Sequence, residues 1–228
     1  MIITSWSSIP NNLKNDDVYN YYEILSKRKF SLLIKRVFDI IISLIMIILM
    51  LPLILVISIV IKLDSKCNVF FMQRRVTQYG RVFRIFKFRT MVNNAESLGT
   101  QVTVSNDSRV TKVGKVLRKY RLDEVPQLFN IFLGDMSFVG TRPEVEKYVE
   151  KYTNEMKATL LMPAGVTSLA SICFKDEEKL LKDGKDTDTT YVEQVLPQKM
   201  KYNLEYIKDF NFFNDIVIMF KTVIAVLK

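Results

Sequence analysis

The 228-residue sequence contains no histidine and only two cysteines, Cys67 and Cys173. The absence of histidine excludes Ser-His-Asp triads, Cys-His nucleophile pairs and the common histidine-containing zinc sites. Two cysteines far apart in the chain argue against a disulfide scaffold and against a cysteine-rich zinc site. Any bound metal would therefore need hard oxygen ligands, which favours magnesium, manganese or calcium.

Acidic residues are the minority charge, with 24 Asp and Glu against 33 Lys and Arg. A net charge of +9 predicts an anionic partner, such as phospholipid, nucleic acid or a phosphorylated substrate. The sequence carries no recognised nucleic-acid-binding motif, so we do not expect nucleic acid to be the partner. The chain length suits one compact domain with an appendage.

Charge is missing altogether from residues 40–61. A straight helix over this run would be about 30 Å long, which is the thickness of the hydrocarbon core of a bilayer. Pro52 lies in the middle of the run and removes a backbone donor, so we expect the helix to kink there. Length alone leaves two interpretations open: a single spanning helix, or a re-entrant segment that returns to the same face.

Basic residues on both sides of the uncharged run favour the re-entrant interpretation. The positive-inside rule places both flanks in the cytoplasm, and a single span could satisfy only one of them. We therefore predict an N-terminal extension of unknown role over residues 1–30, a membrane-embedded helix–break–helix over 31–63 and a cytoplasmic domain over 64–228. The basic residues are Lys27, Arg28, Lys29, Lys35 and Arg36 before the run, and Lys62, Lys66, Arg74 and Arg75 after it.

The cytoplasmic part shows one β signal. Residues 68–76 and 81–90 are rich in Val, Phe and Ile and flank Tyr79-Gly80, a pattern that predicts a β-hairpin. The second arm interleaves basic and aromatic residues, which is typical of a half-buried strand with one basic side.

The rest of this part shows helical patterns. Residues 111–121 have helical spacing of apolar residues, with Thr111 as N-cap. An amphipathic helix follows Asp123 and ends at Gly134, and residues 197–227 contain two more helices. The apolar stripe of the last one either packs on the core or lies on the membrane surface. The predicted class is α+β, mainly α.

Two adjacent carboxylates, Asp123 and Glu124, stand inside the stretch RKYRLDEVPQLFN. One interpretation is structural: Asp123 caps a helix and Pro126 occupies its first turn. The other is chemical, because a carboxylate kept ionised by helix N–H groups can attack phosphorus and form an acyl phosphate. That attack would need a divalent metal and basic side chains nearby. Arg118, Arg121 and Arg142 are candidates, but spacing alone favours the structural interpretation.

Several long motifs occur in an order that resembles a known family. They include FRIFKFRTM, DSRVTKVGKVLRKYRLDEVPQLFNIFLGDMSFVGTRPE and AGVTSLASI, together with the proline-interrupted hydrophobic segment that precedes them. From about Lys35 to Lys228 the chain resembles the bacterial sugar transferases, the monotopic phosphoglycosyl transferases, in their small single-domain form.

The resemblance implies transfer of a phosphosugar from a UDP-sugar to a polyprenol (undecaprenyl) phosphate, with release of UMP. This reaction is the first membrane step in the synthesis of bacterial capsule, exopolysaccharide, O-antigen or glycoprotein glycans. The resemblance further implies Mg²⁺ as cofactor, a phospholipid membrane as partner, and a catalytic domain on the cytoplasmic face of the inner membrane. A homo-oligomer is left open.

The resemblance also assigns roles to residues. Asp123 is the expected nucleophile and lies near the metal, Glu124 supports catalysis, and Pro52 marks the break in the membrane segment. The expected substrate-binding residues are Arg118, Arg142, Pro143, Glu144, Lys87 and Arg89.

The sequence departs from the family pattern in three loops. Thr141 stands where a proline usually precedes the arginine of GTRPE, and Arg121 replaces a small residue before the carboxylate pair. Ala164 and Ser168 replace a proline and a glycine. These differences leave the catalytic residues intact and fall in loops expected to select the sugar or the nucleotide.

Overall fold

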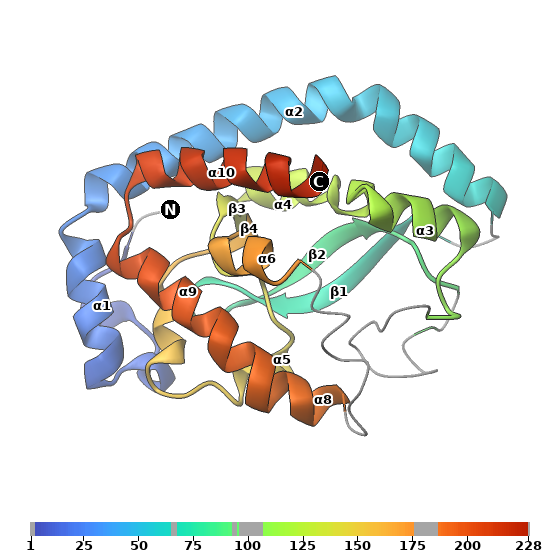
Figure 1. Ribbon diagram of the computed structural model, residues 1–228. Coiled ribbons are helices and arrows are strands. Elements are labelled where there is room, and N and C mark those ends of the chain that lie inside the picture. The colour runs from blue at the N-terminus through green and yellow to red at the C-terminus, as the bar shows by residue number, and fades with distance from the viewer. Residues whose placement is uncertain (1–2, 65–67, 93–94, 96–106, 176–186, 228) are drawn as a thin grey trace.

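The computed structural model describes residues 3–64, 68–92, 95, 107–175 and 187–227. This part of the chain is mainly helical with a few strands, as predicted (Figure 1). Its helices are α1 (Asp16–Ser26), α2 (Lys29–Asp64), α3 (Lys112–Lys119), α4 (Gln127–Leu133), α5 (Glu146–Val149), α6 (Leu169–Cys173), α8 (Thr187–Thr190), α9 (Leu196–Lys208) and α10 (Phe212–Leu227). Its strands are β1 (Phe70–Val76), β2 (Val82–Phe88), β3 (Met136–Val139) and β4 (Ala164–Thr167).

The predicted hairpin is confirmed. Strands β1 and β2 pair antiparallel, from Phe70 opposite Phe88 to Val76 opposite Val82. Tyr79 and Gly80 turn the chain with φ angles of 59° and 76°. Glycine adopts such angles readily, and the tyrosine is a minority case.

A second, parallel pair of strands was not predicted from the sequence. Strand β3 pairs with β4, with Met136 opposite Ala164 and Val139 opposite Thr167. The backbone of Gly140, directly after β3, and that of Gly165, within β4, approach closely: a Cβ on Gly165 would lie 2.1 Å from the nitrogen of Gly140. Only glycine therefore fits at this position, which sets the path of the chain just before Arg142.

Helix α2 runs unbroken through Pro52 for 36 residues and arches over the body of the protein (Figure 1). In place of the predicted helix–break–helix, the structure has one continuous, arched helix that contains Pro52. A proline removes one backbone hydrogen bond and bends a helix, but packing on both sides of it can keep the helix continuous. The packing buries residues of α2 on both sides of Pro52: Leu32, Lys35, Asp39 and Ser43 before it, and Ile54, Ile57 and Ile61 after it.

Both halves of α2 are attached to the same body. In the first half, Lys35 Nζ donates to the carbonyl oxygen of Val139 at 2.8 Å and pairs with Asp215 Oδ2 of α10 at 2.5 Å. In the second half, Ile54, Ile57 and Ile61 form an apolar cluster with Phe88 of β2 and Leu117 of α3. The two ends of the helix are thus held on one side by the same folded unit.

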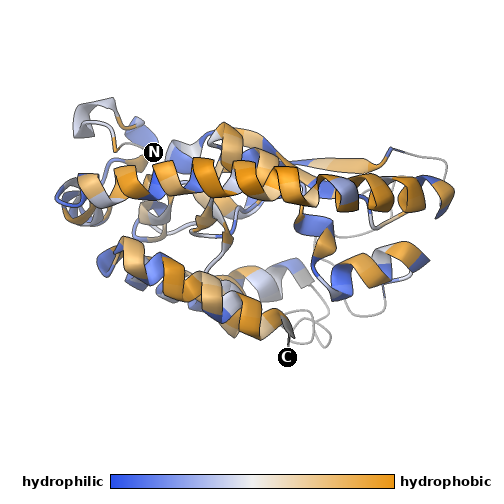
Figure 2. Ribbon diagram, turned by 90° about the horizontal axis from the view of Figure 1, so that it is seen from above, coloured by the Kyte–Doolittle hydropathy of each residue, from blue (hydrophilic) through white to orange (hydrophobic). Residues whose placement is uncertain are grey.

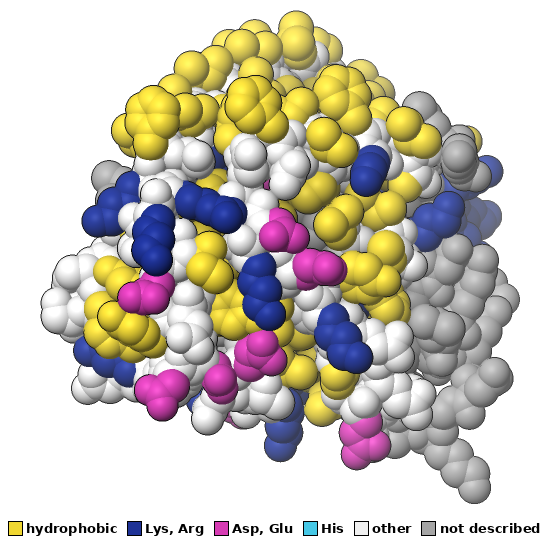
Figure 3. All heavy atoms as spheres, turned by 60° about the vertical axis from the view of Figure 1, so that its left-hand side comes forward, with side chains coloured by type: hydrophobic (Ala, Val, Ile, Leu, Met, Phe, Trp, Pro, Cys, Tyr) yellow, Lys and Arg dark blue, Asp and Glu magenta, His cyan; other side chains and the backbone are white. Residues whose placement is uncertain are grey.

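The outward faces of α2 and α10 are apolar and exposed. Leu49 of α2 is 66% exposed, and Phe213 and Phe220 of α10 are 75% and 68% exposed. Both helices are mainly hydrophobic in Figure 2, and hydrophobic side chains gather on the upper part of the face in Figure 3, above a band that contains Lys and Arg. The stripe on α10 therefore does not pack on the core. Among the described residues, α2 is the helix that is long and apolar enough to cross a membrane.

The N-terminal residues are a structural part of the body. Leu13, Val18 and Leu25 are fully or almost fully buried and belong to the main hydrophobic core. The hydroxyl of Tyr21 donates to Glu155 Oε1 at 2.6 Å. This segment, whose role the sequence does not reveal, therefore packs against the region around Met156–Leu161 and α9.

Candidate active site

A cleft of about 1050 Å³ contains most of the predicted site residues. The cleft is lined partly by charged and partly by apolar side chains. The charged ones come from β2, α3, the turn before α4 and the segment after β3, and the apolar ones include side chains of α2, α6 and α10. The predicted residues that line it are Lys87, Arg118, Arg121, Asp123, Glu124, Arg142, Pro143 and Glu144.

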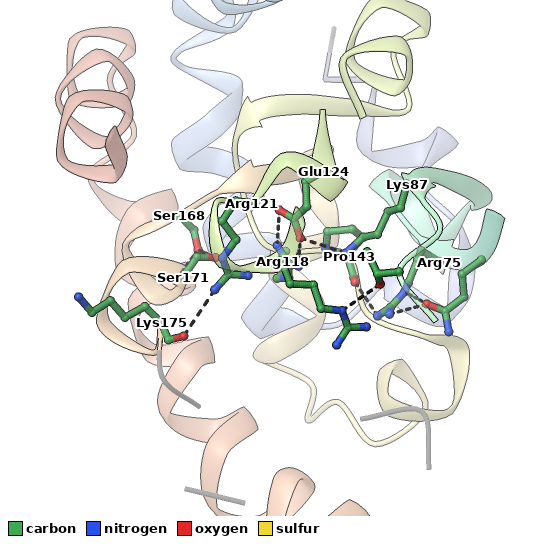
Figure 4. Close-up of polar contacts among 12 residues, drawn as sticks. Arg75, Lys87, Arg118, Arg121, Glu124, Pro143, Ser168, Ser171 and Lys175 are labelled. Atoms are coloured by element: carbon green, nitrogen blue, oxygen red, sulfur yellow. Dashed lines mark hydrogen bonds and ion pairs between the residues drawn. The ribbon is translucent and has the colours of Figure 1, made fainter. Parts of the chain in front are cut away.

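Glu124 is held by two cations from distant segments. Its Oε1 atom accepts from Lys87 Nζ of β2 at 3.0 Å and from Arg142 Nη2 at 2.5 Å (Figure 4). Burial alone would raise the pKa of Glu124, but the Arg142 guanidinium and the Lys87 ammonium hold that pKa well below its usual range. Glu124 is therefore ionised at neutral pH and its carboxylate is already paired.

Asp123 has the opposite environment. It is 8% exposed, and within the described part of the chain its Oδ1 atom has no hydrogen-bond partner. Burial raises the pKa of Asp123 and the adjacent Glu124 raises it further, whereas Lys87, Arg118 and Arg142 oppose the rise. Two neighbouring carboxylates thus differ in both pairing and pKa, a division typical of sites where carboxylates have separate roles.

The prediction that Asp123 caps the helix is wrong. Asp123 lies in a short 3₁₀ turn, Leu122–Glu124, and the residue that precedes α4 is Pro126, which makes no side-chain cap. Arg121 begins the turn in the left-handed conformation, with φ 55°, so the chain changes direction between α3 and α4. Asp123 therefore receives no hydrogen bond from the N-terminus of α4, and the cations around it provide the favourable field.

The three candidate arginines differ in their placement. Arg118 comes from the last turn of α3, and its Nε atom donates to Thr90 Oγ1 at 2.9 Å. Arg142 is bound to Glu124, as described above. Arg121 is exposed, and its Nη2 atom lies 3.5 Å from the carbonyl oxygen of Lys175. In Figure 4, Arg121 and Lys87 lie on opposite sides of Glu124.

Glu144 belongs to a buried network. Its Oε1 accepts from the Tyr191 hydroxyl at 2.5 Å and lies 3.7 Å from Lys199 Nζ, and its Oε2 lies 3.9 Å from Arg75 Nη1. Arg75 also donates to the carbonyl oxygen of Pro143 at 3.1 Å. The network fixes the segment that carries Arg142.

Arg89 comes directly after β2 and is not among the residues that line the cleft. The structure therefore does not bring this predicted residue to the site. Conversely, sequence reasoning missed several polar lining residues, among them Arg75, Gln127, Tyr191 and Lys199. Gln127 was detectable, since it lies four residues after Asp123 in the motif. The other three gave no local signal.

The residues around Asp123 fit a magnesium ion only if the substrate supplies part of its ligands. Among the described residues, no group of three or more Asp, Glu or Cys side chains could hold a metal ion. Glu124 is committed to its cations, which leaves Asp123 as the carboxylate available to a metal. Magnesium commonly uses one or two carboxylates together with substrate phosphates and water, so Asp123 would hold a metal that the substrate also binds.

The raised pKa of Asp123 predicts a stability cost. Because the folded-state pKa lies above the unfolded value of about 3.9, the free energy of unfolding falls as the pH rises from the unfolded to the folded pKa, and the full cost of ionising Asp123 is present above the folded pKa. Asp123→Asn should therefore raise the melting temperature by about 2–4 °C at pH 7 without divalent cations, and the gain should vanish below about pH 4. Thermal unfolding of the purified chain measures this, with Asp17→Asn at an exposed site as the control. A melting temperature at pH 7 equal to or below that of the unsubstituted chain would contradict the assignment.

Comparison with known proteins agrees with these features. The chain matches the family model described as bacterial sugar transferase over residues 30–228. It is 38% identical over 197 residues to a UDP-N-acetylgalactosamine-undecaprenyl-phosphate N-acetylgalactosaminephosphotransferase of Aeromonas hydrophila, which covers 85% of this chain and 44% of that protein. It is 35% identical over 196 residues to a UDP-glucose:undecaprenyl-phosphate glucose-1-phosphate transferase of Klebsiella pneumoniae, which covers 85% and 40%.

A relative of similar length is the exopolysaccharide production protein ExoY of Sinorhizobium fredii, 33% identical over 207 residues, with 84% of each chain covered. The chain thus spans less than half of the Aeromonas and Klebsiella relatives and most of ExoY. Residues 30–228, which the family model matches, contain every residue that lines the cleft. The chain belongs to the bacterial sugar transferase family.

Proposed function

We propose that the protein is a phosphoglycosyl transferase that moves a phosphosugar from a UDP-sugar to a polyprenol phosphate, with release of UMP. The observation that carries this proposal is the cleft itself, in which an unpaired carboxylate oxygen, several cations and the apolar side chains of α2 and α10 line one space. The names of the Aeromonas and Klebsiella relatives specify the same class of donor and undecaprenyl phosphate as acceptor.

The first step is attack of the Asp123 carboxylate on the β-phosphorus of the UDP-sugar. A bond forms between the aspartate oxygen and phosphorus, and the bond to the bridging oxygen breaks, so UMP leaves with the electron pair. The side chains of Arg118, Arg142 and Lys87 face the charge that develops on the phosphoryl oxygens. Asp123 would hold a magnesium ion together with the diphosphate, and that ion would supply positive charge to the leaving group.

In the second step a phosphate oxygen of the polyprenol phosphate attacks the phosphosugar held on Asp123. The aspartate leaves as a carboxylate and the product is a polyprenol diphosphosugar. The Asp123 carboxylate and the polyprenol phosphate are both nucleophilic in their ionised forms, so neither step needs a general base to remove a proton. The reaction therefore needs no histidine.

Glu124 has a positioning role in the proposed reaction, because it pairs with Lys87 and Arg142. Its depressed pKa makes it a poor acceptor for a proton at neutral pH, whereas its contacts hold Lys87 and Arg142 beside Asp123. We therefore assign it the role of fixing the two cations, in preference to handling the proton of the acceptor.

The apolar lining suits the hydrocarbon chain of the acceptor. Met46 and Met50 of α2 and Met219, Val223 and Val226 of α10 line the same cleft as Asp123. The outer faces of both helices are apolar and exposed, as expected of surfaces in contact with lipid. A polyprenol phosphate could then place its chain along these helices and its phosphate near the cations.

The attachment of α2 supports a one-sided membrane topology. A straight helix of 36 residues is about 54 Å long, so a spanning α2 would separate its ends by more than a bilayer core. Instead both halves pack on the same body, through Lys35 in one half and Ile61 in the other. We propose that α2 is re-entrant, with the catalytic part on the cytoplasmic face of the inner membrane.

The activity is tested by incubating the membrane-reconstituted chain with Mg²⁺, polyprenol phosphate and UDP-glucose, UDP-galactose or UDP-N-acetylgalactosamine. At least one sugar should give UMP and a lipid-linked diphosphosugar. Asp123→Asn should lower turnover at least about 10³-fold because the nucleophile is lost, whereas Asp17→Asn should leave it unchanged. No UMP with any donor would sink the proposed reaction, and near-normal turnover of Asp123→Asn would remove Asp123 from its role.

The topology is tested by cysteine labelling in intact cells and in inverted vesicles. Lys27→Cys and Asp64→Cys, both exposed sites flanking the apolar run, are each placed in a chain that carries Cys67→Ser and Cys173→Ser. A membrane-impermeant maleimide should label both positions only from the cytoplasmic side. Labelling of the two positions from opposite sides would show that α2 spans the bilayer.

A further inference from the structure

Gln127 is a buried amide whose polar atoms are not used by the fold. It is the first residue of α4, is 1% exposed and lines the same cleft as Asp123. Neither its Oε1 nor its Nε2 atom has a hydrogen-bond partner in the part of the chain that the structure describes. Buried amides are normally paired, and leaving one unpaired destabilises the folded state.

A second amide on the same helix shows the usual arrangement. Asn130, fully buried and three residues later, accepts from the backbone N–H of Phe86 and donates to the carbonyl oxygen of Arg84, each at 2.9 Å. This pair of bonds joins α4 to β2. The fold therefore uses one amide of α4 to attach the helix and presents the other to the cleft.

The surroundings of Gln127 indicate what it meets there. Asp123 Oδ1 is also buried and unpaired, and no hydrogen bond joins the two side chains. Positive charge is already provided by Lys87, Arg118 and Arg142, which all act on Asp123. A neutral amide adds no further charge, but it adds directional bonds, with two N–H donors and one acceptor.

We infer that Gln127 binds the phosphosugar while Asp123 receives it. Its Nε2 atom donates to a phosphoryl oxygen, and its Oε1 atom accepts from a hydroxyl of the attached sugar. A hexose phosphate offers both groups side by side, since its phosphoryl oxygens only accept and its hydroxyls can donate. Gln127 is then a substrate-contacting residue of the donor half-reaction. This inference rests on the proposed function.

The test is Gln127→Met, which keeps the length of the side chain and removes both polar atoms. Without ligand, the variant should unfold at the same or a higher temperature, because it no longer buries an unpaired amide. In the assay of UMP release, with the UDP-sugar that the unsubstituted enzyme uses best, kcat/KM should fall about 10- to 100-fold, the loss expected for hydrogen bonds to a charged group. Asn130→Leu is the matched control, and it should lower the melting temperature because both bonds to β2 are lost.

A second readout does not depend on turnover. In the Asp123→Asn chain, which should bind the donor without reacting, the UDP-sugar should raise the melting temperature. Adding Gln127→Met to that chain should abolish most of this rise.

The outcomes separate the inference from the proposed function. If the unsubstituted enzyme releases UMP and Gln127→Met keeps kcat/KM within twofold, Gln127 does not bind the phosphosugar although the function stands. A clear drop in the melting temperature of ligand-free Gln127→Met would also overturn the inference, because it would make Gln127 a structural residue. If the unsubstituted enzyme releases no UMP from any donor, the proposed function fails and the inference fails with it.

Discussion

The ion pairs of Glu124 with Lys87 and Arg142 hold the candidate active site together. They join β2, the turn before α4 and the segment after β3, three regions that are far apart in the sequence. These charges are partly or largely shielded from water, so removing one partner would leave the others uncompensated. Because Glu124 satisfies the cations, Asp123 beside it stays unpaired. Two acidic residues that are adjacent in the chain thus differ in pairing: Glu124 anchors the cations, and Asp123 keeps an unpaired oxygen, as the proposed function requires of the nucleophile.

The membrane imposes the second constraint. The outer face of α2 is apolar and exposed, as expected of a surface in contact with lipid, yet both of its halves are packed on the same folded body. The cleft consequently lies where apolar helices meet charged side chains, which is the arrangement that the proposed transfer from a water-soluble anionic donor to a lipid-borne acceptor would need. The buried pair of Lys35 and Asp215 connects α2 to α10 and keeps these two apolar helices in a fixed relation.

Local patterns predicted the parts of the fold that depend on neighbouring residues. The hairpin, the capped start of α3 at Thr111 and the end of α4 at Gly134 are all as predicted. The parallel pair β3–β4 was missed because each strand is short and pairs across more than twenty residues. The cap assigned to Asp123 was wrong because a left-handed residue and a proline set the path of the chain. The network of Glu144 with Tyr191 and Lys199 was not visible in the sequence, since tertiary packing alone brings those residues together.

In the proposed reaction, Asp123 carries the phosphosugar between donor and acceptor. Isotope exchange tests it most directly: the enzyme is incubated with unlabelled UDP-sugar, Mg²⁺ and radiolabelled UMP in the complete absence of polyprenol phosphate. A covalent intermediate makes the first step reversible on its own, so label should enter the UDP-sugar at a rate that depends on Asp123. An enzyme that makes lipid-linked product in the full assay but shows no exchange without acceptor would contradict the account, because the sugar phosphate would then pass directly from donor to lipid.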